Sequence, residues 1–268
     1  MNGLRLNVPN VAATEETTSC HYVKFGLIVT GKAEEEHLPK LFKSLTESRV
    51  CNFEVIRRVG QRSPVSSEKR KLEMVMSGKQ IPDKDETEIG LPARTFLGND
   101  RCRFVILVDD LERDREALAD KVFERYRDAL VMILKKEQRF RVAVHFLVNM
   151  LEAYFFADAA CLNSGLNLNP PVEDYDGDVE DIPHPKNKLR SIHPGYDEME
   201  GGGKILSCLD LEHVLSRSDT CAYLRTMFAW CLKVMERNPY FDQAGYSEKY
   251  RLRDGILSHT TDIQLAGI

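Results

Sequence analysis

Residues 104–112 constrain the fold of this chain more than any other segment. Five apolar residues, 104–108, lead directly into the carboxylates of Asp109, Asp110 and Glu112. The length and β-branched content of the apolar run predict a strand that is buried on both faces of a sheet. Open α/β sheets place their ligand sites at the carboxyl ends of the strands, so these acids are expected at a binding edge.

Two interpretations of the acids remain open at this point. Crowded carboxylates repel one another unless a cation neutralises them, and Mg²⁺ or Mn²⁺ prefers such hard oxygen ligands. Alternatively, the strand is followed by an acidic first turn of a helix, where Asp and Glu suit the helix dipole.

Composition and charge exclude several classes of protein. A net charge of −5 argues against binding of polyanions by bulk electrostatics, although a local basic groove remains compatible with it. No apolar run is long enough to span a bilayer, so no membrane partner is expected. Residues 1–21 lack the basic start and apolar core of a secretion signal and are expected to form a flexible tail. The seven cysteines are scattered and odd in number, which predicts reduced thiols and a cytoplasmic location.

Strand and helix patterns alternate through the first part of the chain. Strands are expected at 22–30, 53–59, 103–109 and 139–146, and helices at 33–48, 112–136 and 149–162. This alternation predicts an α/β fold with a mainly parallel sheet flanked by helices. The core is expected to span 22–162, with a long insertion at 60–100 that begins basic and holds a short helix around 68–76.

The second part of the chain has a different pattern. Residues 163–203 are rich in Pro, Gly, Asp and Asn and are expected to be irregular. Two apolar-periodic helices follow at 205–216 and 220–237, and residues from 238 onward resemble a polar tail. The sequence therefore predicts a C-terminal helical appendage over 163–268.

Three further segments contain candidate residues for chemistry. Glu34 follows the first strand in the turn Thr30-Gly-Lys-Ala-Glu, and Glu152 lies in an otherwise apolar segment where a carboxylate is costly to bury without a partner. Lys186 and Lys188 lie in the irregular stretch, where they could hold a phosphate or stabilise charge in a transition state. Each has a structural alternative: an acidic helix start, one wet face of a helix, and solvated loop lysines.

Several familiar sites are excluded. The chain has no GxGxxG after its first strand, no GxxxxGK[ST] and no GxSxG. Residues 174–178 resemble a calcium loop, but the glycine is misplaced and the terminal bidentate Glu is missing. His184 and His193 lack nearby cysteine or histidine partners for a zinc site.

Taken in order, these segments resemble the Toprim fold of topoisomerases, primases and overcoming-lysogenisation-defect nucleases. More specifically, they resemble the RloG-type family of Toprim-like bacterial proteins, which are linked to ABC/AAA-type ATPases in restriction and phage-defence loci. The resemblance spans about residues 25–234, outside the 60–100 insertion. It rests on the segments TGKAEE, FVILVDDLE, NMLEAYFFAD, HPKNKL, GGKILSCLDLEHVL and CAYLRTMFAWCLKV.

The chain departs from the Toprim pattern at two places. Thr30-Gly31 stands where Toprim domains have Glu-Gly, so the nearest acid is Glu34. The Asp-x-Asp pair becomes Asp109-Asp110-Leu111-Glu112, which leaves open whether Asp109 or the pair Asp110 and Glu112 would hold a metal.

The resemblance implies a metal-dependent nuclease that acts on DNA or RNA with such an ATPase. Mg²⁺ or Mn²⁺ would be held by Glu34, Asp109, Asp110 and Glu112. Catalysis would involve Glu34, Asp109, Glu152 and Lys188, with Lys186 as an alternative phosphate contact. The first rival hypothesis is a non-catalytic partner of the ATPase whose site is eroded at Thr30. A small-molecule phosphotransferase or phosphatase is a weaker third, and the oligomeric state stays open, a homo-oligomer included.

Overall fold

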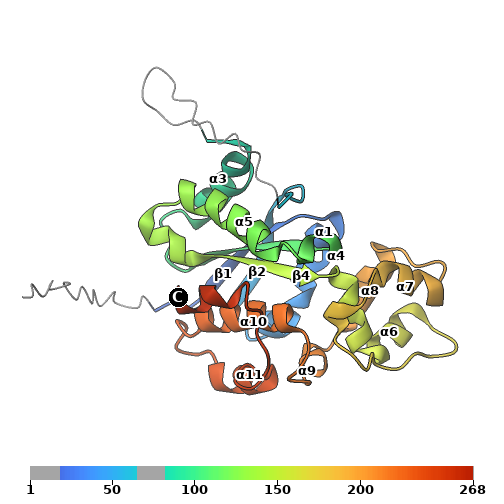
Figure 1. Ribbon diagram of the computed structural model, residues 1–268. Helices are drawn as coiled ribbons and strands as arrows, with labels where there is room; N and C mark the ends of the chain where they lie inside the picture. The colour runs from blue at the N-terminus through green and yellow to red at the C-terminus, as the bar shows by residue number, and fades with distance from the viewer. Residues whose placement is uncertain (1–18, 65–81, 268) are drawn as a thin grey trace, which may run out of the picture.

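The protein is built on one four-stranded parallel sheet, shown in the computed structural model of Figure 1. The structure describes residues 19–64 and 82–267. The strands stand in the order β2-β1-β3-β4 and are β1 (Val23–Val29), β2 (Cys51–Arg58), β3 (Arg103–Leu111) and β4 (Val142–Val148). The expected α/β fold with a mainly parallel sheet is confirmed.

The two central strands are apolar because both of their faces are covered. Phe25 pairs with Phe104 and Val29 with Val108 across β1 and β3. Phe25 and Phe104 face a core that contains Trp230, whereas Val105 belongs to a second core on the opposite face. A run of large apolar residues without alternation is what a strand between two cores requires.

Helices form a layer on each face of the sheet (Figure 1). One layer contains α1 (Lys32–Leu41), α2 (Lys43–Thr46) and α10 (Ala222–Met235). The other contains the π-helical turn η1 (Glu86–Gly90), α3 (Leu91–Leu97) and α5 (Ala119–Ile133). Because α10 packs against β4 and Trp230 lies in the sheet's core, part of the expected C-terminal appendage belongs to the central layers.

Two expected helices are interrupted, and a third element begins later than expected. The pattern at 112–136 divides into α4 (Arg113–Glu116) and α5. The pattern at 149–162 divides into the 3₁₀ helix η3 (Leu151–Ala157) and α6 (Ala159–Leu166), because the Asp158 carboxylate caps α6 by accepting from the Cys161 N–H. Residues 136–141 form the 3₁₀ helix η2 (Lys136–Arg141), so β4 begins only at Val142.

The region expected to be irregular contains regular elements. Residues 163–203 include η4 (Val179–Asp181), α7 (Pro185–Ile192) and the start of α8 (Glu200–Cys208). The short helix α9 (Leu211–Val214) follows. In Figure 1, α6, α7 and α8 gather at one end of the molecule.

The expectation of a polar tail after 238 is wrong. Residues beyond it form α11 (Gln243–Lys249) and η5 (Asp262–Gly267). Arg225 of α10 is fully buried, and its guanidinium donates to the backbone carbonyls of Leu215, Arg217, Thr220 and Tyr250. Gln264 bonds both the N–H and the carbonyl of Val144, so its carboxamide covers part of the open edge of β4.

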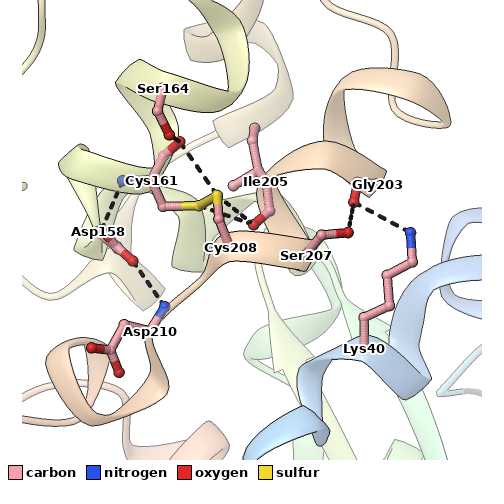
Figure 2. Close-up of a disulfide and its surroundings, with 9 residues drawn as sticks. All are labelled: Lys40, Asp158, Cys161, Ser164, Gly203, Ile205, Ser207, Cys208 and Asp210. Carbon is pink, nitrogen blue, oxygen red and sulfur yellow. Dashed lines mark hydrogen bonds between the residues drawn. A yellow bond between two sulfur atoms is a disulfide. The ribbon is translucent and has the colours of Figure 1, made fainter.

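The expectation of reduced thiols is wrong for four of the seven cysteines. Disulfides join Cys20 to Cys102 and Cys161 to Cys208, and Cys51, Cys221 and Cys231 are free and buried. Figure 2 shows the second disulfide, which links α6 to α8 beside the Asp158 cap. Disulfides are rare in reducing cytosol, so the cytoplasmic location stays a prediction.

Three remaining expectations concern the tail, the insertion and the membrane. Most of the expected 1–21 tail and the helix expected at 68–76 lie outside the described residues. The later part of the 60–100 insertion forms η1 and α3, which cover one face of the sheet. Within the described part of the chain, no helix is long and apolar enough to cross a membrane.

Candidate functional site

The candidate site lies where the strand order of the sheet reverses direction. The chain leaves β1 into α1 on one face, and it leaves β3 into α4 and α5 toward the other face. A crevice at the carboxyl ends of two such neighbouring strands is the usual ligand site of open parallel sheets. Because β1 and β3 are paired, Thr30 at the end of β1 lies beside Asp109 and Asp110 of β3.

Asp109 is a buried partner of Arg115. Its carboxylate has no solvent exposure, and Oδ2 lies 2.5 Å from Arg115 Nη2. The other oxygen, Oδ1, accepts from the Thr30 hydroxyl at 2.8 Å and from Arg115 Nη1 at 3.5 Å. Arg115 also donates to the carbonyls of Asp110 and Arg62. Both oxygens of Asp109 are therefore engaged, and Thr30 supplies one of the donors.

Asp110, unlike Asp109, has no ion-pair partner in the described part of the chain and is surrounded by other carboxylates. Its Oδ1 is enclosed and has no hydrogen-bond partner among the described residues. Burial raises the pKa of this carboxyl well above its ordinary value, and the negative charge of Glu34 raises it further, followed by the charges of Glu152 and Asp109. A carboxyl that is destabilised as an anion by other carboxylates is suited to bind a cation.

Glu34 reaches Asp110 from the first turn of α1. It is 4% exposed, and its carboxylate folds back over Gly31. A Cβ on Gly31 would lie 1.8 Å from Glu34 Oε2, so a side chain at position 31 would displace the carboxylate. The glycine of the Thr-Gly-Lys-Ala-Glu turn thus makes room for the acid three residues later.

Glu152 lies just after the turn that follows β4. Asn149 and Met150 adopt positive φ angles of 55° and 77°, which turn the chain sharply between β4 and η3. Buried Glu152 accepts from the Tyr196 hydroxyl at 3.3 Å and lies 3.6 Å from Lys186 Nζ. Burial raises the pKa of the Glu152 carboxyl, although the Lys186 ammonium acts in the opposite direction.

The structure brings together only part of the predicted set. Glu34, Asp110 and Glu152 lie near enough at the carboxyl ends of the strands for their charges to act on one another. Asp109 lies at the same edge but forms a structural ion pair with Arg115. Glu112 is the N-cap residue of α4 and is partly buried, and Lys188 places its ammonium over the rings of Tyr175 and Phe156.

The sequence did not predict that Arg115 would form an ion pair with Asp109. Arg115 lies six residues after Asp109 on a short helix within an acidic-basic run, where a solvated charge is the ordinary interpretation. Tyr196 was missed as well, because it comes from an apparently irregular segment that the fold returns to Glu152. The adjacent lysine of α7 that reaches Glu152 is Lys186, which also forms an ion pair with Glu198.

The donor set fits a weakly held divalent cation better than a closed structural metal site. Among the described residues, no three His, Cys, Asp or Glu side chains are arranged to hold a metal ion. Mg²⁺, however, is usually bound by one or two carboxylates and completes its shell with waters and substrate phosphates. The unpartnered Asp110 Oδ1 beside Glu34 supplies oxygen donors of that kind.

Comparison with known protein families gives a match over residues 29–228, to DUF4276, a domain of unknown function. The chain belongs to the DUF4276 family. The matched residues contain Thr30, both acids of β3, Glu152 and Lys186, so the whole carboxylate cluster lies within the family domain. No curated protein and no solved structure matches this DUF4276 chain.

Proposed function

We propose that this DUF4276 protein is a Mg²⁺- or Mn²⁺-dependent nuclease of a bacterial defence system that acts with an ABC/AAA-type ATPase in the cytoplasm. The observation that carries the proposal is the unpartnered Asp110 Oδ1, which is enclosed beside Glu34 at the carboxyl ends of the central strands. The order of the motifs along the chain, which resembles the Toprim pattern, supports nucleic acid as the substrate and the ATPase as the partner.

Asp110 and Glu34 would hold the metal in this proposal. When bound, the metal would polarise a phosphoryl oxygen and lower the pKa of a coordinated water. Asp109 would take no direct part, since both of its oxygens are engaged by Arg115 and Thr30. Its role would be to fix the end of β3, because Arg115 joins the Asp109 carboxylate to the carbonyls of Asp110 and Arg62.

Glu152 would accept a proton from water, and Lys186 would contact the phosphate. The raised pKa of the Glu152 carboxyl brings it closer to the operating pH, which suits a group that accepts a proton from water. Tyr196 donates to Glu152 and would keep its carboxylate oriented. The Lys186 ammonium lies between Glu152 and Glu198 and would stabilise negative charge on the phosphate.

The non-catalytic alternative has an observation in its favour. In an eroded site, Glu152 would be neutralised by a lysine, and Lys186 lies 3.6 Å from it. Thr30, which replaces the Toprim glutamate, donates to Asp109 and completes a local network without a metal. The protein would then be a Toprim-like regulatory or partner subunit of the ATPase.

A cleavage assay with single-site variants separates these two functions. Labelled DNA and RNA would be incubated with Mg²⁺ or Mn²⁺, with and without an ABC/AAA-type ATPase. Wild type is expected to cleave, and Asp110→Asn and Glu34→Gln should each lower the rate at least about 100-fold by removing a charged ligand. Glu36→Gln is the matched control, because Glu36 is exposed on the same helix as Glu34.

Two outcomes would contradict the proposal. Cleavage that survives Asp110→Asn unchanged would place the active site elsewhere. A wild-type protein that cleaves neither nucleic acid, with or without the ATPase, would support the partner subunit.

A further inference from the structure

A cavity of about 450 Å³ lies between residues 172–177 and helix α7. Its walls are partly aromatic and its rim is acidic. Phe156, Tyr175 and Lys188 lie in the walls, and the exposed Glu173, Asp174 and Asp176 lie at the rim.

The cavity and the carboxylate site are built from the same two elements. The 3₁₀ helix η3 carries Glu152 and, four residues later, Phe156, which corresponds to roughly 8 Å along such a helix. Helix α7 carries Lys186 beside Glu152 and Lys188 beside Phe156. The cavity therefore opens a distance of about one or two nucleotides from the carboxylates.

The N–H groups of the Lys188 ammonium have no hydrogen-bond acceptor among the described residues. Its Nζ lies 4.1 Å from the centre of the Tyr175 ring and 4.8 Å from that of Phe156. Burial lowers the pKa of this lysine, and no carboxylate or carbonyl in the described part of the chain accepts a hydrogen bond from it. The ammonium is thus held at the cavity by ring faces, and its N–H groups can bond a ligand.

The rim of the cavity supplies carboxylates, which accept hydrogen bonds. Asp174 is engaged by the Ala159 N–H and by His213. Glu173 and Asp176 are exposed and have no hydrogen-bond or ion-pair partner among the described residues, so both can accept hydrogen bonds from a ligand. Three carboxylates against one lysine disfavour a phosphate in this cavity.

We propose that this cavity binds the base of a nucleotide next to the phosphodiester that is cut, with a preference for bases that carry an exocyclic amino group. A base that stacks on Tyr175 would take the place of the Lys188 ammonium on that ring face, and the displaced ammonium would donate to a ring or carbonyl acceptor of the base. The amino donors of the base would meet Glu173 or Asp176. The inference rests on the proposed nuclease function and narrows its substrate. A base stacked in a duplex has no free face, so the substrate is single-stranded or has its base turned out of the helix.

The test is a calorimetric titration with nucleoside monophosphates in the presence of a chelator, so that neither metal nor cleavage is needed. GMP, AMP and CMP should bind more tightly than UMP, and ribose 5-phosphate should bind least. Tyr175→Leu should weaken GMP binding at least about fivefold through loss of stacking, whereas Tyr175→Phe should retain it. Lys188→Met should also weaken binding. Tyr240→Leu, at a tyrosine that is 75% exposed, is the matched control and should have no effect.

The outcomes separate this inference from the nuclease proposal. Cleavage by wild type with equal affinity for GMP and ribose 5-phosphate, or with no effect of Tyr175→Leu and Lys188→Met, would overturn the base site alone. Displacement of GMP by spermidine with equal loss in both variants would indicate a site for cations and would overturn it as well. Base-selective binding by a protein that cleaves no nucleic acid would uphold the site and refute the nuclease.

Discussion

Replacement of Asp by Asn should change the stability of the protein in opposite directions at Asp109 and at Asp110, two neighbours at the end of β3. Asp109→Asn removes one partner of a buried ion pair and leaves Arg115, whose side chain is only 12% exposed, without its counter-ion. Such a loss typically costs about 3–5 kcal/mol. Arg115 keeps its bonds to the carbonyls of Asp110 and Arg62, so the lower end, about 3 kcal/mol, is expected.

Asp110→Asn should instead stabilise the metal-free protein. Two unit charges 4 Å apart repel by about 4 kcal/mol at an effective dielectric constant of 20, but protonation relieves part of this repulsion. A gain of about 1–2 kcal/mol is therefore expected at a pH where the wild-type carboxyl is ionised. Below its raised pKa, the Asp110 carboxyl is already neutral and the gain should disappear.

The assay is urea unfolding of both variants and wild type in a chelator, with thermal unfolding as a second measure. At about 2–4 °C per kcal/mol, Asp109→Asn should lower Tm by about 6–12 °C. A double-mutant cycle with Arg115→Met should show a total loss smaller than the sum of the two single losses. Equal shifts of the same sign in Asp109→Asn and Asp110→Asn would refute the assignment of the two acids.

Three further predictions concern other positions. Burial raises the pKa of Glu180 to about 7, so its contribution to stability is present below about pH 4.3 and lost as the pH rises through 7; urea unfolding across this window should show a smaller decline for Glu180→Gln. His145 is fully buried with no partner for either ring nitrogen among the described residues, and burial lowers its pKa to about 3. His145→Leu should therefore raise stability by about 1 kcal/mol in thermal unfolding, and a loss above that size would show a hidden polar role. Gly31→Ala should displace the Glu34 carboxylate and abolish any Mn²⁺-dependent rise in Tm, and an unchanged rise would separate Glu34 from the metal.

The sequence predicted the sheet because its signal is local. The apolar runs at 25–29 in β1 and 104–108 in β3 have no polar residue, and a strand between two cores accounts for such a run. The folded C-terminus was missed because its stability comes from contacts distant in sequence. Arg225 bonds the carbonyl of Tyr250 across 25 residues, and Gln264 bonds Val144 across 120 residues.

The candidate site was predictable in its position but not in its charge pairing. The end of β3 and the turn after β1 were expected at one edge, and Thr30 does contact Asp109 there. Which of Asp109 and Asp110 is neutralised depends on Arg115, whose direction is set by tertiary contact with Arg62. The pairing of cysteines could not be predicted from the sequence either, because Cys161 and Cys208 meet only when α6 packs against α8.

The central claim is that Asp110 and Glu34 hold a divalent metal while Asp109 does not. Electron paramagnetic resonance titration with Mn²⁺ detects weak binding directly and can be repeated with Asp110→Asn, Glu34→Gln and the exposed control Glu36→Gln. We expect wild type and Glu36→Gln to bind Mn²⁺ alike and both site variants to bind it at least about tenfold more weakly. Equal Mn²⁺ binding by wild type and Asp110→Asn, or no binding by wild type, would contradict it.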